Sequence, residues 1–325
     1  MTLPTPLRVR LVTTWDIPCG VAEHSRYLVD AVTAADPAIL FETETNLHPD
    51  ALRRRDLPDL ILLNYHAALH SQWTPQHVHD ARRPVAIIYH DSGVPSTDQC
   101  KGLHAVADLF VVHEPVEDLP GAQYLRQGIP AAPLCSYIWG TPSEEGPRQY
   151  YDQPLLGTVG FPFPWKNYDL LVDATAAAGW ALLLLAPTAT PEQIAAWTAR
   201  HPALLVVPDF LPAETVVAYL AGCDATAFLY MTHNAGTSGA IRQGIAARKP
   251  VLATWDCRQF RDLQDTLLGV GAIYWLYDLS IEAVAQALSQ VPIQRVDPGI
   301  VALAERDSWM RVGQRLAALL REVVR

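Results

Sequence analysis

Short, continuous runs of apolar residues alternate with helical patterns along almost the whole chain. Apolar runs of this kind are typical of strands that are covered on both faces of a parallel sheet, with a helix between each pair. We expect helices at 21–34, 168–178 and 191–201, the last opened by Thr190 as N-cap and Pro191 as first residue. The expected strands are 8–13, 60–64, 85–89, 109–112, 155–159, 181–186, 204–207, 225–229, 251–254 and 272–275.

The chain has 325 residues, enough for two domains that each bury their own core. Residues 139–154 are rich in Pro, Gly and charge and have no apolar period, and the alternation of strands and helices restarts after them. We therefore expect an α/β protein with an N-terminal domain at 1–145 and a C-terminal domain at 146–305. Each is predicted to be a doubly wound, Rossmann-like sheet, and the two to face each other across a cleft.

Charge and cysteine content exclude several classes of protein. The net charge is −10 and the only lysines are Lys101, Lys166 and Lys249, whereas a general nucleic-acid binder needs a broad basic face. The five cysteines are scattered and form no CxxC pair, so neither a disulfide framework nor a zinc knuckle is indicated. No run approaches a membrane span or a secretory signal, so we expect a cytoplasmic protein, with peripheral membrane contact left open.

The segment 232–256, THNAGTSGAIRQGIAARKPVLATWD, combines a glycine-bearing loop, a helix start and a buried strand. Backbone amides at a helix start have no partner within the helix, and the helix dipole adds partial positive charge there. Because glycine has no Cβ, a phosphate could approach the amides near Ser238 and Gly239 closely. This segment is a candidate cradle for a diphosphate, in the second half of the chain.

A second candidate for anion binding follows the strand at 155–159. Gly160 ends that strand, a loop of aromatic residues and prolines follows, and Lys166 stands just before a helix. In parallel sheets the carboxyl ends of the strands line the ligand crevice, and a lysine there can pair with phosphate oxygens. A solvated lysine that merely begins a helix is the alternative interpretation.

Two places in the first half could bind a substrate. Gly20 marks a helix start, and His90 with Asp91 follows the strand at 85–89 directly. A His-Asp pair there could bind a hydroxyl or act as acid and base, and a hydrogen-bonded structural histidine is the rival. For His113 and Glu114, after the next strand, the structural interpretation is favoured.

Together these segments resemble the GT-B glycosyltransferases, in particular the large retaining family 4 group. The resemblance rests on CGVAEHSRYLVDA, IIYHDSG, GTVGFPFPWKNYDLLVDA, TSGAIRQGIAARKPVLAT and DSWMRVGQRLAALL, which occur in the expected order. It implies that residues 306–325 include a terminal helix that packs back across the domains.

The chain departs from that group at three positions. An arginine is common where this chain has Phe161, and two glutamates eight positions apart correspond here to Ala235 and Gln243. Gln243 can still hydrogen-bond a ribose, whereas Ala235 cannot replace a carboxylate that contacts the donor sugar.

The resemblance implies transfer of a sugar from a nucleotide diphosphate, such as a UDP- or GDP-sugar, to an acceptor, with retention and without a metal or other cofactor. The acceptor, whether a glycan, a lipid-linked sugar, a metabolite or a protein, stays open. A degenerate GT-B protein that binds a nucleotide sugar or a partner chain is the alternative, and an epimerase or phosphorylase is a third. Lys166 and His90 are the catalytic candidates, and donor binding is assigned to Gly20, Gly160, Phe210, Thr237, Ser238, Gly239 and Gln243.

Overall fold

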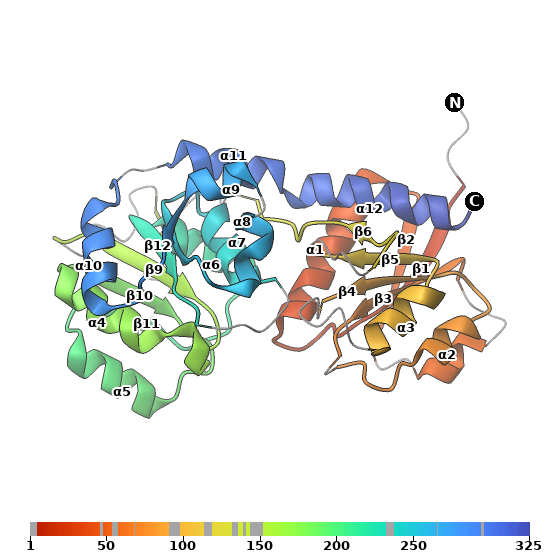
Figure 1. The fold of residues 1–325 in the computed structure, drawn as a ribbon, viewed down its shortest axis with the longest axis horizontal. Helices are drawn as coiled ribbons and strands as arrows, with labels where there is room; N and C mark the ends of the chain where they lie inside the picture. The colour runs from red at the N-terminus through yellow and green to blue at the C-terminus, as the bar shows by residue number, and fades with distance from the viewer. Residues whose placement is uncertain are drawn as a thin grey trace. The chain divides into compact units, whose positions relative to one another are not determined.

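The chain forms two compact units, each built around its own sheet (Figure 1). Unit 1 comprises Met1–Gly128, Asn234–Thr237 and Asp307–Arg325, and unit 2 comprises Ile129–His233 and Ser238–Arg306. The computed structural model describes residues 5–45, 48–53, 58–67, 69–90, 98–113, 119–131, 136–138, 141–143, 152–231, 237–264, 266–293 and 296–325.

Unit 1 contains a six-stranded sheet within the described ranges, in the order β2-β1-β3-β4-β5-β6, and every neighbouring pair is parallel. Its strands are β1 (Leu7–Val12), β2 (Ile39–Glu44), β3 (Leu60–Tyr65), β4 (Val85–Tyr89), β5 (Leu109–Val112) and β6 (Gln123–Tyr124). Its helices are α1 (Gly20–Ala35), α2 (Pro75–His79), α3 (Asp98–Val106) and α12 (Trp309–Val323), with a 3₁₀ turn at Pro49–Arg53.

Both faces of this sheet are buried, because successive side chains of a strand point to opposite sides. In β3, Leu60 and Leu62 join the apolar cluster beneath α1 and α12, whereas Ile61 and Leu63 join the cluster on the other face. This two-sided burial explains why inner strands such as β4 and β5 are apolar on both faces, as is typical of a parallel sheet.

Unit 2 repeats the plan, with a six-stranded parallel sheet in the order β11-β10-β9-β12-β13-β14 among its described residues. The strands of this sheet are β9 (Leu155–Val159), β10 (Ala181–Leu185), β11 (Leu204–Val207), β12 (Ala225–Phe228), β13 (Val251–Thr254) and β14 (Ile273–Leu276). Its helices are α4 (Tyr168–Ala178), α5 (Pro191–Arg200), α6 (Ala213–Ala221), α7 (Gly239–Ala246), α8 (Arg261–Gln264), α9 (Leu267–Ala272), α10 (Ile281–Gln290) and α11 (Pro298–Arg306). Two 3₁₀ turns, Pro164–Lys166 and Arg258–Phe260, and an antiparallel pair, β7 (Ser136–Ile138) with β8 (Thr141–Ser143), complete the unit.

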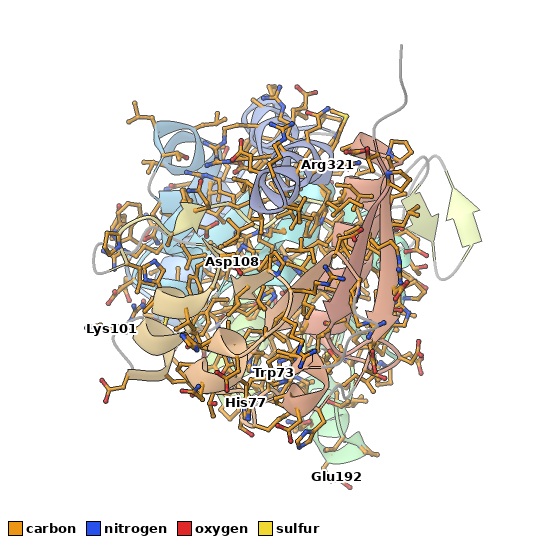
Figure 2. All side chains as sticks on the ribbon, turned by 90° about the vertical axis from the view of Figure 1, so that its right-hand side faces the viewer. Trp73, His77, Lys101, Asp108, Glu192 and Arg321 are labelled. Carbon is orange, nitrogen blue, oxygen red and sulfur yellow. The ribbon has the colours of Figure 1, made fainter. Side chains whose placement is uncertain are left out.

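The C-terminal helix α12 belongs to unit 1. Its buried residues Val312 and Leu316 pack with Leu28 of α1 in the same apolar cluster. Arg321, near the end of this helix, is labelled in Figure 2. It pairs with Asp36, which caps α1, at 2.8 Å between Nε and Oδ2, and it also donates to the carbonyl oxygen of Thr5. The last helix is thus tied to the first strand and the first helix of the chain.

The predicted α/β class with two parallel sheets is confirmed, and so are all the predicted strands, to within a residue at each end. The strand Ile39–Glu44 was not predicted; it is an edge strand with one buried residue, Ile39, and three consecutive polar residues at its end. Most of the predicted linker at 139–154 lies outside the described residues, so the proposed boundary at 145 stays a prediction. No helix in the described part of the chain is long and apolar enough to cross a membrane.

Candidate functional site

The sheet of unit 2 reverses its winding between β9 and β12, which are neighbours in space but far apart in the sequence. From β9 the chain winds outward through β10 to β11, and from β12 it winds the other way through β13 to β14. In open α/β sheets the ligand crevice lies outside the carboxyl ends of the strands at such a switch point. The segments that follow β9 and β12 are therefore the first place to look for a site.

Lys166 lies in the segment after β9, at the end of a 3₁₀ turn. Its Nζ donates a hydrogen bond to the hydroxyl of Tyr230 at 2.9 Å and lies 4.6 Å from the centre of that ring. Tyr230 is fully buried and follows β12. The contact thus joins the carboxyl ends of the two strands at the switch point and holds a positive charge there.

Gly160 makes room for the Lys166 side chain. Its φ is +138°, a conformation that L side chains rarely adopt, and a Cβ at this position would collide with Lys166 Nζ. The backbone of Gly160 is held in place, since its N–H donates to Leu185 O at 3.0 Å and its carbonyl accepts from the Tyr168 hydroxyl at 2.7 Å. Gly160 is therefore required for the position of Lys166, whatever ligand the lysine meets.

Helix α7 begins at the same edge of the sheet. Ser238 is its N-cap in extended conformation, and the Ser238 N–H donates to Gln259 O at 3.3 Å. The next residue, Phe260, has its ring centre 5.0 Å from that of Tyr230. The segment Gln259–Phe260 therefore contacts both the start of α7 and the Lys166–Tyr230 pair. Gln243, one turn into the helix on the side of Gly239, is 7 % exposed.

A buried ion pair fixes the first turn of α7. Arg242 is 1 % exposed, donates to Ser238 O at 2.8 Å through Nη1, and pairs through Nη2 with Asp262 of α8. Because two of its contacts hold the N-cap residue and the neighbouring helix, Arg242 keeps the amides of the helix start in a defined orientation.

Four aromatic rings form a row beside Lys166. Phe161 stacks on Phe210 with ring centres 6.0 Å apart, Phe161 lies 5.9 Å from Phe163, and Phe163 stacks on Trp165 at 4.4 Å. Phe163 and Phe210 are 45 % and 42 % exposed. An exposed row of stacked rings offers a flat surface to another aromatic system.

The structure places two of the predicted donor residues in unit 1. Gly20 is the exposed first residue of α1, and nothing lies within 4 Å of where its Cβ would be. Thr237 also belongs to unit 1, where its hydroxyl donates to Gln127 Oε1 at 2.8 Å. Donor binding by these two residues stays a prediction.

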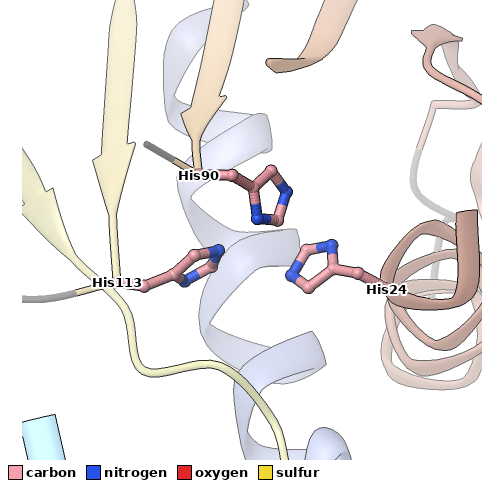
Figure 3. Close-up of side chains that lie close together, drawn as sticks. All are labelled: His24, His90 and His113. Carbon is pink, nitrogen blue, oxygen red and sulfur yellow. The ribbon is translucent and has the colours of Figure 1, made fainter. Parts of the chain in front are cut away.

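His90 lies directly after β4, at the carboxyl edge of the unit 1 sheet, in a group of histidines. The rings of His90, His24 on α1 and His113 after β5 point toward one another, with centres 4.5 to 5.1 Å apart (Figure 3). His90 Nε2 lies 2.5 Å from Oδ1 of the buried Asn64. Burial, and then the neighbouring His24 and His113, hold the pKa of His90 well below its usual range, so this ring is neutral near pH 7.

Sequence reasoning missed several residues of these groups. Tyr230 and Asn64 lie outside the motifs, and His24 lies within one but was not singled out. Each meets its partner only through the order of the strands or the packing of α1. Arg242 had one available signal, since it is a charged residue on the otherwise apolar face of a short helix. The expected residues Asp91, Glu114 and Ala235 lie outside the described residues.

The comparisons with known proteins bear on the fold. No protein-family model and no curated protein matches the sequence. Among solved structures, the chain is similar to Anabaena Alr3699/HepE in complex with UDP-glucose, with a TM-score of 0.68, 15% identity and coverage of 97% of this chain and 100% of that one. It is also similar to AviGT4, a glycosyltransferase of avilamycin A biosynthesis (TM-score 0.61, 14% identity, 98% of each chain). A third is the lipopolysaccharide outer core galactosyltransferase WaaB (TM-score 0.61, 11% identity, 97% of this chain and 100% of that one). These likenesses show the fold, which is that of the GT-B proteins.

Proposed function

We propose that the chain is a glycosyltransferase that uses a nucleotide-diphosphate sugar. The observation that carries the proposal is the position of Lys166 at the switch point of the unit 2 sheet, held by Tyr230 beside the start of α7. The fold-level likeness to proteins described as glycosyltransferases, one of them holding UDP-glucose, supports the same class of reaction.

The chemical difficulty of this reaction is the departure of a nucleoside diphosphate while the anomeric carbon gains oxocarbenium character. A fixed ammonium and fixed amide dipoles stabilise the charge that grows on the departing phosphate. We assign these roles to Lys166 and to the amides near Ser238 and Gly239, of which the Ser238 N–H is itself bonded to Gln259 O, so that the amides from Gly239 onward face the phosphate. We place Gln243 toward the ribose. Arg242 acts as a positioning residue, because it contacts the N-cap rather than the ligand.

For the base we propose stacking on the aromatic row that ends at Phe210. Stacking of a base on an aromatic side chain contributes about 1–3 kcal/mol and is tolerant of base identity. The row includes Phe161, where related enzymes commonly carry an arginine, so here dispersion and stacking replace one cationic contact.

For unit 1 we propose acceptor binding, with His90 at the carboxyl edge of its sheet in contact with a sugar hydroxyl. The reaction is proposed to retain configuration: the acceptor attacks from the side of the leaving group, and the departing phosphate takes the acceptor proton. This scheme needs neither a separate base on the protein nor a metal ion at the diphosphate.

The test is donor turnover by the purified chain with a panel of UDP- and GDP-sugars, together with calorimetric titration of the free nucleoside diphosphates. Lys166→Ala should lower the rate of donor consumption about 10²–10³-fold at saturating donor. Lys101→Ala is the matched control, since Lys101 is an exposed lysine of α3 in unit 1 (Figure 2). Equal rates for the Lys166 variant and the wild type would refute the assignment.

One observation favours a second candidate, a protein that binds a nucleotide sugar without turnover. The loop before Lys166 presents aromatic rings and prolines where the group that the chain resembles commonly carries an arginine. Binding of a nucleoside diphosphate with no consumption of any donor would establish this alternative.

A further inference from the structure

Three histidines from separate elements meet at the carboxyl edge of the unit 1 sheet. His24 comes from the second turn of α1, His90 directly follows β4, and His113 directly follows β5 (Figure 3). His24 and His113 are 3 % and 2 % exposed, so these polar rings are removed from water. The unit 1 sheet also reverses its winding nearby, between β1 and β3, and a ligand crevice is expected at such an edge.

The spacing of the three rings suits one metal ion. One ring nitrogen from each histidine lies within 4.8 Å of the other two. A tetrahedral zinc site with Zn–N bonds of about 2.0–2.1 Å needs these nitrogens about 3.4 Å apart and the ring centres about 5 Å apart. The observed ring centres are 4.5, 5.0 and 5.1 Å apart, so small rotations of the side chains bring the nitrogens to a common ion.

The hydrogen bonds around the cluster set the ring tautomers for coordination. His113 Nδ1 lies 2.9 Å from the carbonyl oxygen of Leu125, and His90 Nε2 lies against the Asn64 side-chain carbonyl. A carbonyl oxygen only accepts, so these two nitrogens carry the protons, and the lone pairs are on His113 Nε2 and His90 Nδ1. Histidine ligands usually donate their other N–H to a carbonyl or carboxylate in this way.

We propose that His24, His90 and His113 form a binding site for a divalent first-row transition-metal ion, with Zn²⁺ as the reference ligand. Three neutral imidazoles suit Zn²⁺, Co²⁺, Ni²⁺ or Cu²⁺, whereas Mg²⁺ and Ca²⁺ prefer oxygen ligands. Within the described residues the group contains histidines alone, so three protein ligands leave the fourth position to water or to a hydroxyl oxygen. The site lies within unit 1 and shares His90 with the proposed acceptor contact, but metal binding itself needs neither donor nor transfer.

One alternative arrangement explains the cluster without a metal. Asn64 Nδ2 lies 3.4 Å from His24 Nδ1. If this amide donates to Nδ1, the proton of His24 is on Nε2, and the three rings form a hydrogen-bonded network. Asn64 Nδ2 lies closer to Ser25 Oγ, at 2.7 Å, and its two N–H groups can serve both partners, so metal binding itself has to decide between the two tautomers of His24.

The test uses the full chain without an affinity tag, stripped with a chelator and then equilibrated by dialysis against Zn²⁺. We expect one tightly held zinc per chain by elemental analysis, lost in His24→Ala and in His113→Ala. His201→Ala is the matched control, because His201 is 2 % exposed but lies in unit 2, outside the cluster, and it should keep the zinc. Failure of the wild type to retain zinc, or equal retention by all variants, would overturn the proposal.

A second measurement covers the case in which the alanine variants do not fold. Co²⁺ added to the stripped wild type should give the visible d–d bands of a four-coordinate site with nitrogen ligands, and one equivalent of Zn²⁺ should abolish them. A spectrum like that of hydrated Co²⁺ would mean that the cluster is only a hydrogen-bonded network. Both measurements omit nucleotide, so a chain that binds zinc but transfers no sugar, or the reverse, separates this proposal from the proposed function.

Discussion

Replacing Gly160 with alanine should lower both stability and transfer, for two separable reasons. The φ of +138° is strained for any L residue, and such strain costs about 1–3 kcal/mol. For a domain of this size that cost lowers the melting temperature by about 2–4 °C per kcal/mol. In addition, the new Cβ would collide with Lys166 Nζ and lie 3.2 Å from its Cε, so the ammonium must leave its place beside Tyr230.

The second effect decides the expected rate. If the displaced ammonium no longer meets the departing phosphate, donor turnover should fall by up to about 10²–10³-fold, the usual effect of removing one fixed electrostatic group. The assay is donor consumption at saturating nucleotide sugar, divided by the folded fraction from circular dichroism. Gly179→Ala is the matched control: it has φ +70° and nothing within 4 Å of its Cβ, so it should lower stability alone.

A double variant tests whether the two positions act through one another. In a Lys166→Ala background there is no Nζ for the alanine at 160 to displace, so Gly160→Ala should lower stability without a further loss of rate. The reasoning would be refuted if the two losses of rate multiplied. It would also be refuted if Gly160→Ala alone kept the wild-type rate per folded molecule.

Three further predictions concern other parts of the chain. Gly239→Val should weaken binding of a nucleoside diphosphate about 100-fold, measured by calorimetry. This loss corresponds to two charge-assisted hydrogen bonds of about 1.5 kcal/mol each. An unchanged affinity in a folded variant would mean that the nucleotide binds elsewhere. His90→Ala should lower the rate of transfer about 10–100-fold. It should leave the affinity for a nucleoside diphosphate intact, because the diphosphate is assigned to unit 2. A lower melting temperature with normal activity per folded molecule would contradict this prediction. Burial lowers the pKa of His201 below its usual 6.5, so the unfolded chain takes up a proton at a higher pH than the folded one. The contribution of His201 to the free energy of unfolding is therefore present above pH 6.5 and is lost as the pH falls, by at most about 1.4 kcal/mol per pH unit. His201→Gln should reduce this dependence of the free energy of unfolding on pH, measured by urea titrations. The same dependence in variant and wild type would contradict the prediction.

The inner strands of both sheets could be predicted from the sequence because they are buried on both faces. The runs at 85–89 and 155–159 are buried at every position, and their observed bounds are those predicted. The edge strand β2, ILFETE, pairs on one side only and keeps charged residues, so its pattern does not differ from that of a loop. Its partner β1 was predicted, but pairing partners are not encoded in a local pattern.

The candidate sites likewise have a part that a local sequence pattern predicts and a part that depends on contacts between distant segments. The sequence alone determined that Lys166 and His90 follow strands, because a strand's end is a local property of the apolar pattern. That Lys166 meets Tyr230, and that His24 and His113 meet His90, was decided only by the tertiary structure. The physical reason is that the order of strands in a sheet, and the face on which a helix packs, depend on contacts between segments far apart in the chain, which no local periodicity contains.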